Sequence, residues 1–286
     1  MSSAVGLIGE DRPPWFRTSF DGRFSPAMRQ LLLDYSRIPL EDIDNHVYTI
    51  REKAWQISAY PCIGGFSFLS LTFTTHRQYK AVLERLKSPL DDEKLIDLGC
   101  CFGQAVRKLA FDGVPHERLY GSDVRPGLLE LGFELFNDRD KWSPASFFPM
   151  DIFHPVVPGN LKFHVVLISM VFHLFSLERQ IQAAIEIITR LLVDKPGVMI
   201  FGSQGGTINP RSVPSRRNIG RESYLHDVNS FKAMWEEVGQ KTGTKWEVDV
   251  KLEEICKDGE NGTLTERHRY FKGEDMRWLI FSVKKI

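Results

Sequence analysis

Short apolar runs alternate with amphipathic segments between about residues 94 and 202. The runs at 94–98, 118–122, 163–169 and 198–202 predict strands, and a weaker strand is predicted at 146–150. The segments 104–111, 127–136 and 177–192 lie between or beside these runs and predict helices. Strands that alternate with helices, and that are almost wholly apolar, indicate a parallel sheet covered by helices on both faces.

The first ninety or so residues predict helices that are separated by proline and glycine. Ser25 and Pro26 form an N-cap and N1 pair, which opens a helix over 27–35. Apolar residues at helical spacing predict further helices over 41–58 and 76–87. The dense apolar segment 66–73 is compatible with either a helix or a strand.

The part after residue 202 predicts a loop, a helix and two terminal strands. The segment 203–222 is rich in glycine, proline and arginine, which is typical of a loop. A helix is predicted over 228–238, with Asp227 as its N-cap and Gly239 just past its end. Runs at 246–252 and 277–284 predict the last two strands, which brings the predicted sheet to seven strands.

Length, charge and cysteine content exclude several classes of protein. The chain has 286 residues, which suits one large domain or two small ones. Its 37 basic and 37 acidic side chains give no net basic field, so we expect no nucleic-acid partner. The apolar runs fall short of the ~20 residues of a membrane span, and the first residues lack the apolar core of a secretory signal. The four cysteines lack CxxC spacing, so we expect a cytoplasmic protein without a disulfide framework or a metal site.

The most informative segment follows the first predicted strand. This strand runs into Asp97, and Gly99 and Gly103 then form a turn before a helix. In such sheets, ligands bind outside the carboxyl ends of the strands, and glycine allows the backbone to approach a ligand closely. Asp123 follows Gly103 by twenty residues, at the end of the second strand, where an acid accepts hydrogen bonds from ribose hydroxyls.

The spacing of the glycines distinguishes between cofactors. A dinucleotide site requires GxGxxG, whereas the turn from Gly99 to Gly103 reads GxxxG. Asp97 would repel a pyrophosphate, and it suits a cationic group such as the ammonium of S-adenosylmethionine. The two acids therefore favour S-adenosyl-L-methionine over NAD.

The run 96–103 resembles motif I of the class I S-adenosylmethionine-dependent methyltransferases, and the resemblance extends over 95–286. It implies a Rossmann-like α/β fold with a mostly parallel seven-stranded sheet. Cys101 stands where the family's pattern has its middle glycine, a tolerable departure because cysteine is small. The resemblance also implies cofactor contacts after the second, third and fourth strands, at Asp123, Val124, Asp151, Ile152, Ser169 and Met170.

Together with its helical N-terminal part, the chain is similar to fungal secondary-metabolite methyltransferases, particularly those of meroterpenoid pathways. This resemblance implies O-methylation of a carboxyl or hydroxyl group on an apolar terpenoid or polyketide intermediate. We expect residues 1–90 to form a helical cap that contributes to the substrate pocket, and residues 91–286 to form the cofactor-binding domain. A homodimer is left open.

Several residues have more than one interpretation. His173 follows the fourth strand, where it either acts on the methyl acceptor as a base or hydrogen-bond donor, or only frames the pocket. Asp123 has an alternative role as the N-cap of the helix after Pro126. The arginines of the 203–222 segment are either solvated or include one that binds an acidic substrate; they are Arg211, Arg216, Arg217 and Arg221.

Two other functions remain open at this stage. The fold can hold the cofactor as a fixed charge during a cyclisation or rearrangement, because a fold does not determine the chemistry. A non-catalytic interaction protein is the other alternative, although the acids Asp97 and Asp123 argue against it. The neutral charge favours a small-molecule acceptor over protein or RNA.

Overall fold

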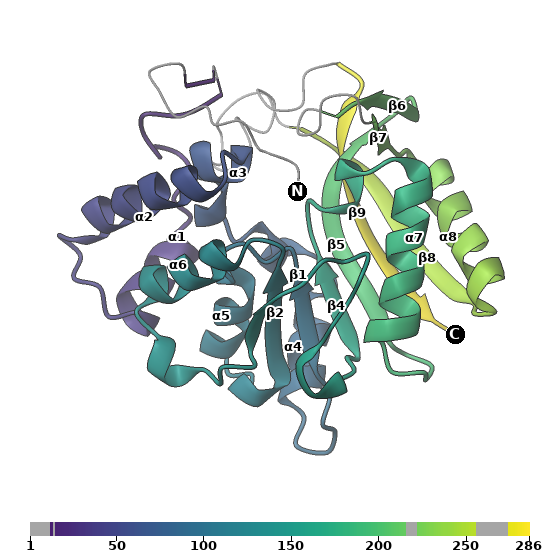
Figure 1. Cartoon of the computed structure of the whole chain (residues 1–286), viewed down its shortest axis with the longest axis horizontal. Helices are drawn as coiled ribbons and strands as arrows, with labels where there is room; N and C mark the ends of the chain where they lie inside the picture. Colours follow the sequence, from purple (N-terminus) through teal and green to yellow (C-terminus); the bar gives the residue numbers. More distant parts are fainter. Residues whose placement is uncertain (1–11, 14, 216–221, 256–273) are drawn as a thin grey trace.

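A seven-stranded sheet forms the centre of the chain, for which the computed structural model describes residues 12–13, 15–215, 222–255 and 274–286 (Figure 1). Its strand order is β3-β2-β1-β4-β5-β9-β8. The strands are β1 (Leu95–Leu98), β2 (Leu119–Asp123), β3 (Phe147–Pro149), β4 (Val165–Ile168), β5 (Met199–Thr207), β8 (Trp246–Glu254) and β9 (Met276–Lys285). The first five are parallel, and β9 is antiparallel to both β5 and β8. The predicted α/β fold with its mostly parallel sheet is confirmed.

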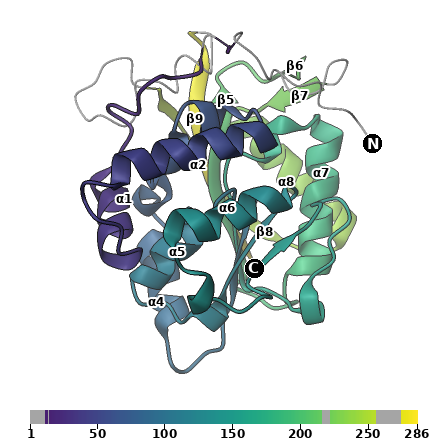
Figure 2. The ribbon, with the colours of Figure 1, turned by 60° about the vertical axis from the view of Figure 1, so that its left-hand side comes forward.

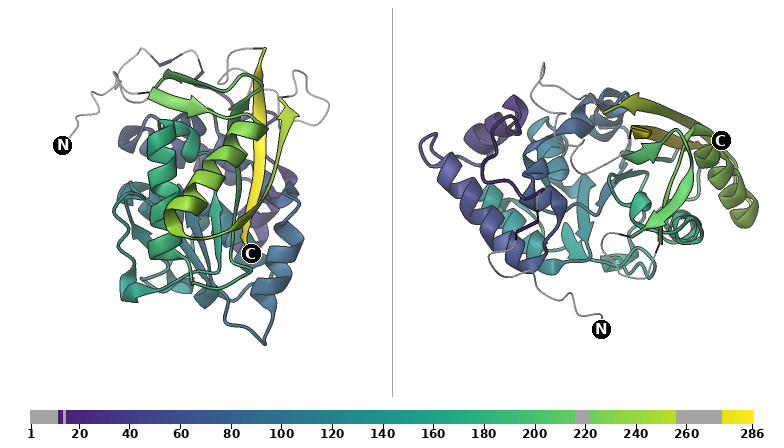
Figure 3. Two further views of the ribbon diagram at one scale, coloured as in Figure 1. Left: turned by 90° about the vertical axis from the view of Figure 1, so that its right-hand side faces the viewer. Right: turned by 90° about the horizontal axis from the view of Figure 1, so that it is seen from above.

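Helices cover both faces of this sheet (Figure 3). The helices α4 (Tyr79–Lys87), α5 (Gln104–Phe111) and α6 (Pro126–Phe136) lie on one face, and α7 (Leu177–Glu186) and α8 (Val228–Thr242) lie on the other. Alternate residues of each strand serve the two layers: Leu95 packs in the core of α4 and α5, whereas its neighbour Ile96 packs in the core of α7 and α8. Every residue of β1 and β4 is buried, as expected for central parallel strands.

The N-terminal helices form a layer outside α6. They are α1 (Pro26–Gln30), the π turn η1 (Leu31–Tyr35), α2 (Ile43–Ile57), α3 (Pro61–Gly64) and the 3₁₀ turns η2 (Ser67–Leu69) and η3 (Thr72–Thr75). Ser25 caps the first helix as predicted, and its Oγ accepts a hydrogen bond of 3.1 Å from the Met28 amide. Helix α2 lies alongside α6 (Figure 2) and shares a core with Leu128, Leu131 and Leu135.

The predicted loop at 203–222 was wrong for the part that the structure describes. Strand β5 continues to Thr207, and β6 (Arg211–Pro214) pairs with β7 (Glu222–Leu225) as an antiparallel hairpin. The glycines that suggested a loop lie inside a strand: a Cβ built on Gly206 would come within 2.8 Å of the Leu279 Cβ. Glycine permits this close packing between β5 and β9, so tertiary contacts override its low strand propensity.

Two further sequence predictions differ from the structure. Gly239 lies inside α8, which continues to Thr242; a Cβ built on Gly239 would lie 2.7 Å from the Thr244 carbonyl oxygen, so close approach requires glycine there. The helix ends instead at Gly243, whose φ is +66°. The segment 66–73 forms neither a long helix nor a strand, but contains η2 and the start of η3.

Short helical turns complete the described elements. They are η4 (His116–Arg118), η5 (Arg139–Lys141), η6 (Pro158–Asn160), η7 (Phe172–Leu174) and the π turn η8 (Ile187–Leu191), which ends the helix predicted over 177–192. Across the described ranges, no helix has both the length and the apolar character that a membrane crossing needs.

Candidate active site

The turn between β1 and α5 has an unusual backbone. Gly99, Cys101 and Gly103 all have positive φ angles, of +74°, +55° and +66°. Cys101 thus adopts the conformation expected of a glycine, at a cost of roughly 1–2 kcal/mol for an L-residue. Its amide compensates by donating a 3.0 Å hydrogen bond to Oδ2 of Asp123. The cysteine is accommodated without changing the path of a glycine-type turn.

Space also requires glycine at two positions of this turn. A Cβ on Gly99 would lie 2.6 Å from Cγ2 of Val171, which follows β4. A Cβ on Gly103 would lie 2.4 Å from Cε1 of Phe147 and 2.7 Å from Nη1 of Arg107. Gly99 itself is exposed, so the turn presents open backbone at the carboxyl end of β1.

Asp97 is a buried acid at the end of β1, with only 6% of its surface exposed. Burial raises the pKa of its carboxyl group to about 8, and the nearby Asp123 raises it further in the same direction. Among the described residues, none donates a hydrogen bond to this carboxyl group or forms an ion pair with it. A buried carboxyl group next to open backbone is suited to a cationic ligand group, which would stabilise its ionised form.

Asp123 links the end of β2 to the turn. Its Oδ2 accepts the Cys101 amide, and its Oδ1 accepts the amide of Arg125 at 2.9 Å. The alternative role as an N-cap is wrong: the N-cap of α6 is Arg125, and no side chain caps that helix. Asp123 therefore fixes the turn and places a second acid beside Asp97.

The other predicted cofactor residues lie at the ends of β2, β3 and β4. Val124 is 57% exposed, directly after Asp123. Asp151 is exposed after β3 and accepts the Phe153 amide at 3.0 Å, and Ile152 beside it is half-buried. After β4, Ser169 and Met170 are tied to β5 by two hydrogen bonds with Ser203, one to Ser169 Oγ and one from the Met170 amide.

His173 lies in η7, two residues beyond Val171, and is 6% exposed. The hairpin strand β7 holds this segment in place: Oγ of Ser223 donates to the Leu174 carbonyl oxygen at 3.2 Å, and the Tyr224 amide donates to that of Phe175 at 2.8 Å. The burial of His173 suits both of its predicted roles, because a pocket wall and an acceptor contact are both shielded from bulk water.

Comparisons with known proteins place the chain in a family. The model of the meroterpenoid methyltransferase N-terminal domain matches residues 15–69. O-methyltransferase atr3 of Stereocaulon alpinum is 40% identical over 84% of this chain and 69% of its own length, and methyltransferase adrK of Penicillium roqueforti is 35% identical over 84% and 86%. The chain belongs to this family of fungal methyltransferases. Among solved structures, phosphoethanolamine N-methyltransferase 2 of Haemonchus contortus is similar with a TM-score of 0.49 and 16% identity, over 90% of this chain and 60% of that one.

The methyl donor predicted from the sequence is S-adenosyl-L-methionine, and the residues at the carboxyl ends of β1 and β2 are compatible with it. The carboxyl group of Asp97, which has no partner within the described ranges, matches a cationic group, and the positive-φ turn leaves backbone accessible at Gly99. In the described part of the methyltransferase, no three histidine, cysteine or acidic side chains group together as metal ligands would.

The structure also reveals a residue that the sequence analysis missed. Gln204 lies in the extension of β5, in the segment predicted to be a loop, and is 1% exposed. Its side-chain amide nitrogen has no hydrogen-bond partner among the described residues. Because the neighbouring glycines predict a loop, no local pattern in the sequence places Gln204 in a strand.

Arg211 is engaged within the methyltransferase itself. Its Nη1 donates to Thr207 Oγ1 at 3.0 Å and to the Asn209 carbonyl oxygen at 2.9 Å, and it forms an ion pair with Asp275. The hydrogen bond from this guanidinium lowers the pKa of Asp275. A structural role in the hairpin therefore accounts for Arg211, while Arg216, Arg217 and Arg221 lie outside the described residues.

Proposed function

We propose that S-adenosylmethionine binds at the carboxyl ends of β1 to β4. Asp97 would hold its ammonium group and Asp123 its ribose hydroxyls, while Asp151 and Ile152 would contact the adenine. The remaining proposed contacts are Gly99, Cys101, Gly103, Val124, Ser169 and Met170. The observation that carries this assignment is the carboxyl group of Asp97 beside the turn, which is buried and has no hydrogen-bond or ion-pair partner in the described part of the chain.

The proposed reaction transfers the methyl group to an oxygen atom of an apolar small molecule. Relatives named O-methyltransferases, and the meroterpenoid name of the matching domain model, support a carboxyl or hydroxyl acceptor on a terpenoid or polyketide intermediate. The bound cofactor supplies an electrophilic methyl group, so the protein mainly aligns the acceptor oxygen with it. The methyltransferase names of the relatives favour transfer over a cyclisation or a non-catalytic role.

The N-terminal region 1–90 would act as a cap on the cofactor domain 91–286 and contribute to the acceptor pocket. Two contacts between the N-terminal region and the cofactor domain support these roles. The ring of Phe68 packs 4.9 Å from that of Phe102 in the turn, and Nε of Arg125 lies 3.4 Å from the Tyr60 hydroxyl. The cap thus contacts both segments that are proposed to bind the cofactor.

The assignment of the cofactor site is tested by Asp123→Ala. We expect this variant to bind S-adenosylmethionine at least about tenfold more weakly, because it loses a charged hydrogen-bond acceptor. Isothermal titration calorimetry measures the affinity. Asp92→Ala removes an exposed acid that precedes β1, away from the turn, and should bind normally. Equally tight binding by wild type and Asp123→Ala would refute the site.

His173 is proposed to act on the acceptor oxygen, either as a general base for a hydroxyl or as a hydrogen-bond donor to a carboxylate. His173→Gln should lower kcat by about 100-fold for a hydroxyl acceptor, since base catalysis contributes about 10²–10⁴-fold. A carboxylate is already ionised at neutral pH and needs no base, so a smaller loss is then expected. The dissociation constant of S-adenosylmethionine should stay unchanged in both cases. A variant with wild-type turnover would show that His173 only frames the pocket.

We also propose that the protein is cytoplasmic and has no nucleic-acid partner, consistent with its 37 basic and 37 acidic side chains. A homodimer is compatible with the proposed activity. Analytical ultracentrifugation distinguishes the monomer, at 32.9 kDa, from a homodimer.

A further inference from the structure

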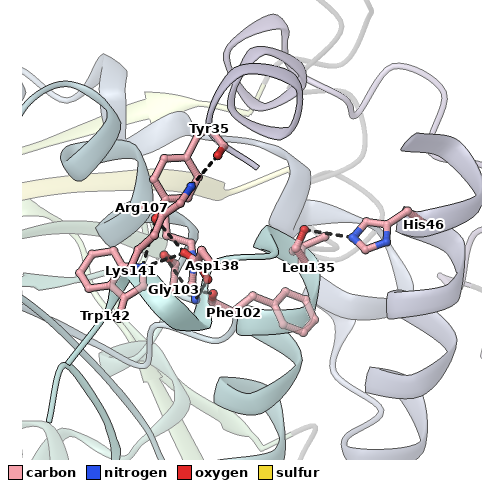
Figure 4. Close-up of polar contacts among 9 residues, drawn as sticks. All are labelled: Tyr35, His46, Phe102, Gly103, Arg107, Leu135, Asp138, Lys141 and Trp142. Atoms are coloured by element: carbon pink, nitrogen blue, oxygen red, sulfur yellow. Dashed lines mark hydrogen bonds and ion pairs between the residues drawn. The ribbon is translucent and has the colours of Figure 1, made fainter. Parts of the chain in front are cut away.

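A fully buried arginine packs against the turn from Gly99 to Gly103, which is called the cofactor turn below. Arg107, in α5, donates from Nε and Nη2 to the two carboxyl oxygens of Asp138, at 2.7 and 2.9 Å (Figure 4). Both side chains are almost wholly inaccessible to solvent. This bidentate geometry neutralises the two charges and fixes the plane of the guanidinium.

The third nitrogen of Arg107 reaches the turn itself. Its Nη1 donates to the carbonyl oxygen of Phe102 at 2.7 Å, and that of Gly103 lies 3.5 Å away. On the opposite edge of the same peptide unit, the Gly103 amide donates to the carbonyl oxygen of Cys100 at 2.8 Å. The peptide between Phe102 and Gly103 is therefore fixed on both edges, and it lies within the segment bounded by the two positive-φ residues Cys101 and Gly103.

The surroundings of the guanidinium exclude water. Its central carbon lies 4.5–5.9 Å from the centroids of four aromatic rings, those of Phe133, Phe136, Trp142 and Phe147. A buried ion pair is often no more stabilising than apolar residues of the same size. The pair is therefore better explained by the geometry that it imposes on the turn than by stability alone.

The N-terminal helices take part in this network. The hydroxyl of Tyr35, in η1, donates to Oδ2 of Asp138 at 2.7 Å, and the indole nitrogen of Trp142 donates to the same oxygen at 2.7 Å (Figure 4). Burial and the adjacent Asp138 raise the pKa of the Tyr35 hydroxyl, so it remains a donor at neutral pH. Tyr35 and Arg107 thus hold the same carboxylate from opposite sides of the boundary between cap and domain.

We propose that Arg107 is a positioning residue for the cofactor turn, and that Tyr35 of the N-terminal helices fixes Arg107 through Asp138. The inference rests on the proposed function, because it takes this turn as the site of S-adenosylmethionine. The N-terminal helices then contribute to cofactor affinity as well as to the acceptor pocket.

Two variants of the 286-residue chain test the network. Arg107→Lys keeps a positive charge beside Asp138. A single ammonium group, however, cannot form both the bidentate hydrogen bonds to the Asp138 carboxylate and the hydrogen bond to the Phe102 carbonyl oxygen. Tyr35→Phe removes a single hydroxyl and keeps the ring. A matched control is His46→Leu, which breaks another contact between cap and domain, the 3.0 Å hydrogen bond from Nε2 to the Leu135 carbonyl oxygen, away from the turn (Figure 4).

Hydrogen exchange of the Phe102–Gln104 amides in the ligand-free protein gives a local readout, and calorimetry gives the affinity for S-adenosylmethionine. We expect exchange at these amides to become at least about tenfold faster in Arg107→Lys, with about tenfold weaker binding. In Tyr35→Phe, exchange at these amides should be about threefold faster and binding of S-adenosylmethionine about threefold weaker. His46→Leu should match wild type in both.

The outcomes separate this inference from the proposed function. Unchanged exchange in the Phe102–Gln104 segment of Arg107→Lys or of Tyr35→Phe would overturn it, as would an equal change in His46→Leu. If Arg107→Lys does not fold, Tyr35→Phe decides alone by the same criteria. Faster exchange with unchanged binding would refute the role in cofactor positioning. If Asp123→Ala also bound normally, the turn itself would not be the cofactor site.

Discussion

Asp97→Asn is expected to bind S-adenosylmethionine about 100-fold more weakly than wild type, because it loses a charge-assisted contact of about 1.5–3 kcal/mol. The same substitution should make the ligand-free protein more stable at pH 8. Both effects follow from burial of the Asp97 carboxyl group without a cationic partner among the described residues. A loss of binding together with a gain in stability is the trade-off expected where a binding site holds an unfavourably buried group.

The pH dependence of stability follows from the raised pKa of Asp97. An aspartate has a pKa of about 3.9 in an unfolded chain, whereas burial raises the pKa of Asp97 to about 8. Between these values the folded protein binds more protons than the unfolded chain, so the free energy of unfolding falls as the pH rises. Asp97→Asn lacks this dependence, and its advantage should reach about 1 kcal/mol or more at pH 8.

Urea denaturation at pH 5 and pH 8, with calorimetry of cofactor binding, measures both effects of Asp97→Asn. Asp92→Asn serves as the control, because Asp92 is an exposed acid shortly before β1. Its free energy of unfolding and its affinity for S-adenosylmethionine should differ from those of wild type only by the small amount typical of a surface substitution. Wild-type affinity in Asp97→Asn, or an advantage in stability that does not grow between pH 5 and pH 8, would contradict the assigned environment of Asp97.

Gly103→Ala is expected to destabilise the protein by about 2–4 kcal/mol and to abolish tight cofactor binding. The φ angle of +66° at Gly103 is unfavourable for alanine. The added Cβ would also overlap the ring of Phe147, at 2.4 Å, and the guanidinium of Arg107, at 2.7 Å. Neither neighbour yields easily, because Phe147 packs in the core and Arg107 is bound to Asp138.

Gly159→Ala is the matched control for Gly103→Ala. Gly159 has the same φ of +66°, but a Cβ built there meets nothing within 4 Å. Its substitution should cost only the backbone strain of about 1–2 kcal/mol and leave cofactor binding unchanged. Chemical denaturation and calorimetry measure the two variants side by side. Equal losses of stability would show that backbone strain alone, and not crowding in the turn, makes Gly103 necessary.

The sequence predicted the sheet and the acidic turn because both depend on local pattern. The strands at 94–98 and 163–169 are short, mostly apolar runs, and Asp97, Gly99, Gly103 and Asp123 lie at or just after strand ends at informative spacings. The hairpin β6–β7 and the end of β5 were missed, because their glycines and prolines are tolerated only through packing against β9 and η7. Contacts between residues that are far apart in the sequence could not be predicted either.

Arg107 illustrates this limit. In the sequence it is one polar residue of an amphipathic helix, and nothing local indicates that it is buried. Its partner Asp138 is 31 residues away, and Tyr35 comes from a different layer of the fold. Such a network is specified by tertiary packing, so only the folded arrangement reveals it.

The most direct test of the account is the number of protons released when S-adenosylmethionine binds at pH 7. Calorimetry in two buffers of different ionisation enthalpy measures this number. Because the Asp97 carboxyl group has a pKa of about 8, it is largely protonated before binding and must ionise to hold the ammonium group. We expect wild type to release about one proton per cofactor bound, and Asp97→Asn to release none. Binding by wild type without proton release, at an affinity that Asp97→Asn shares, would contradict the proposed site.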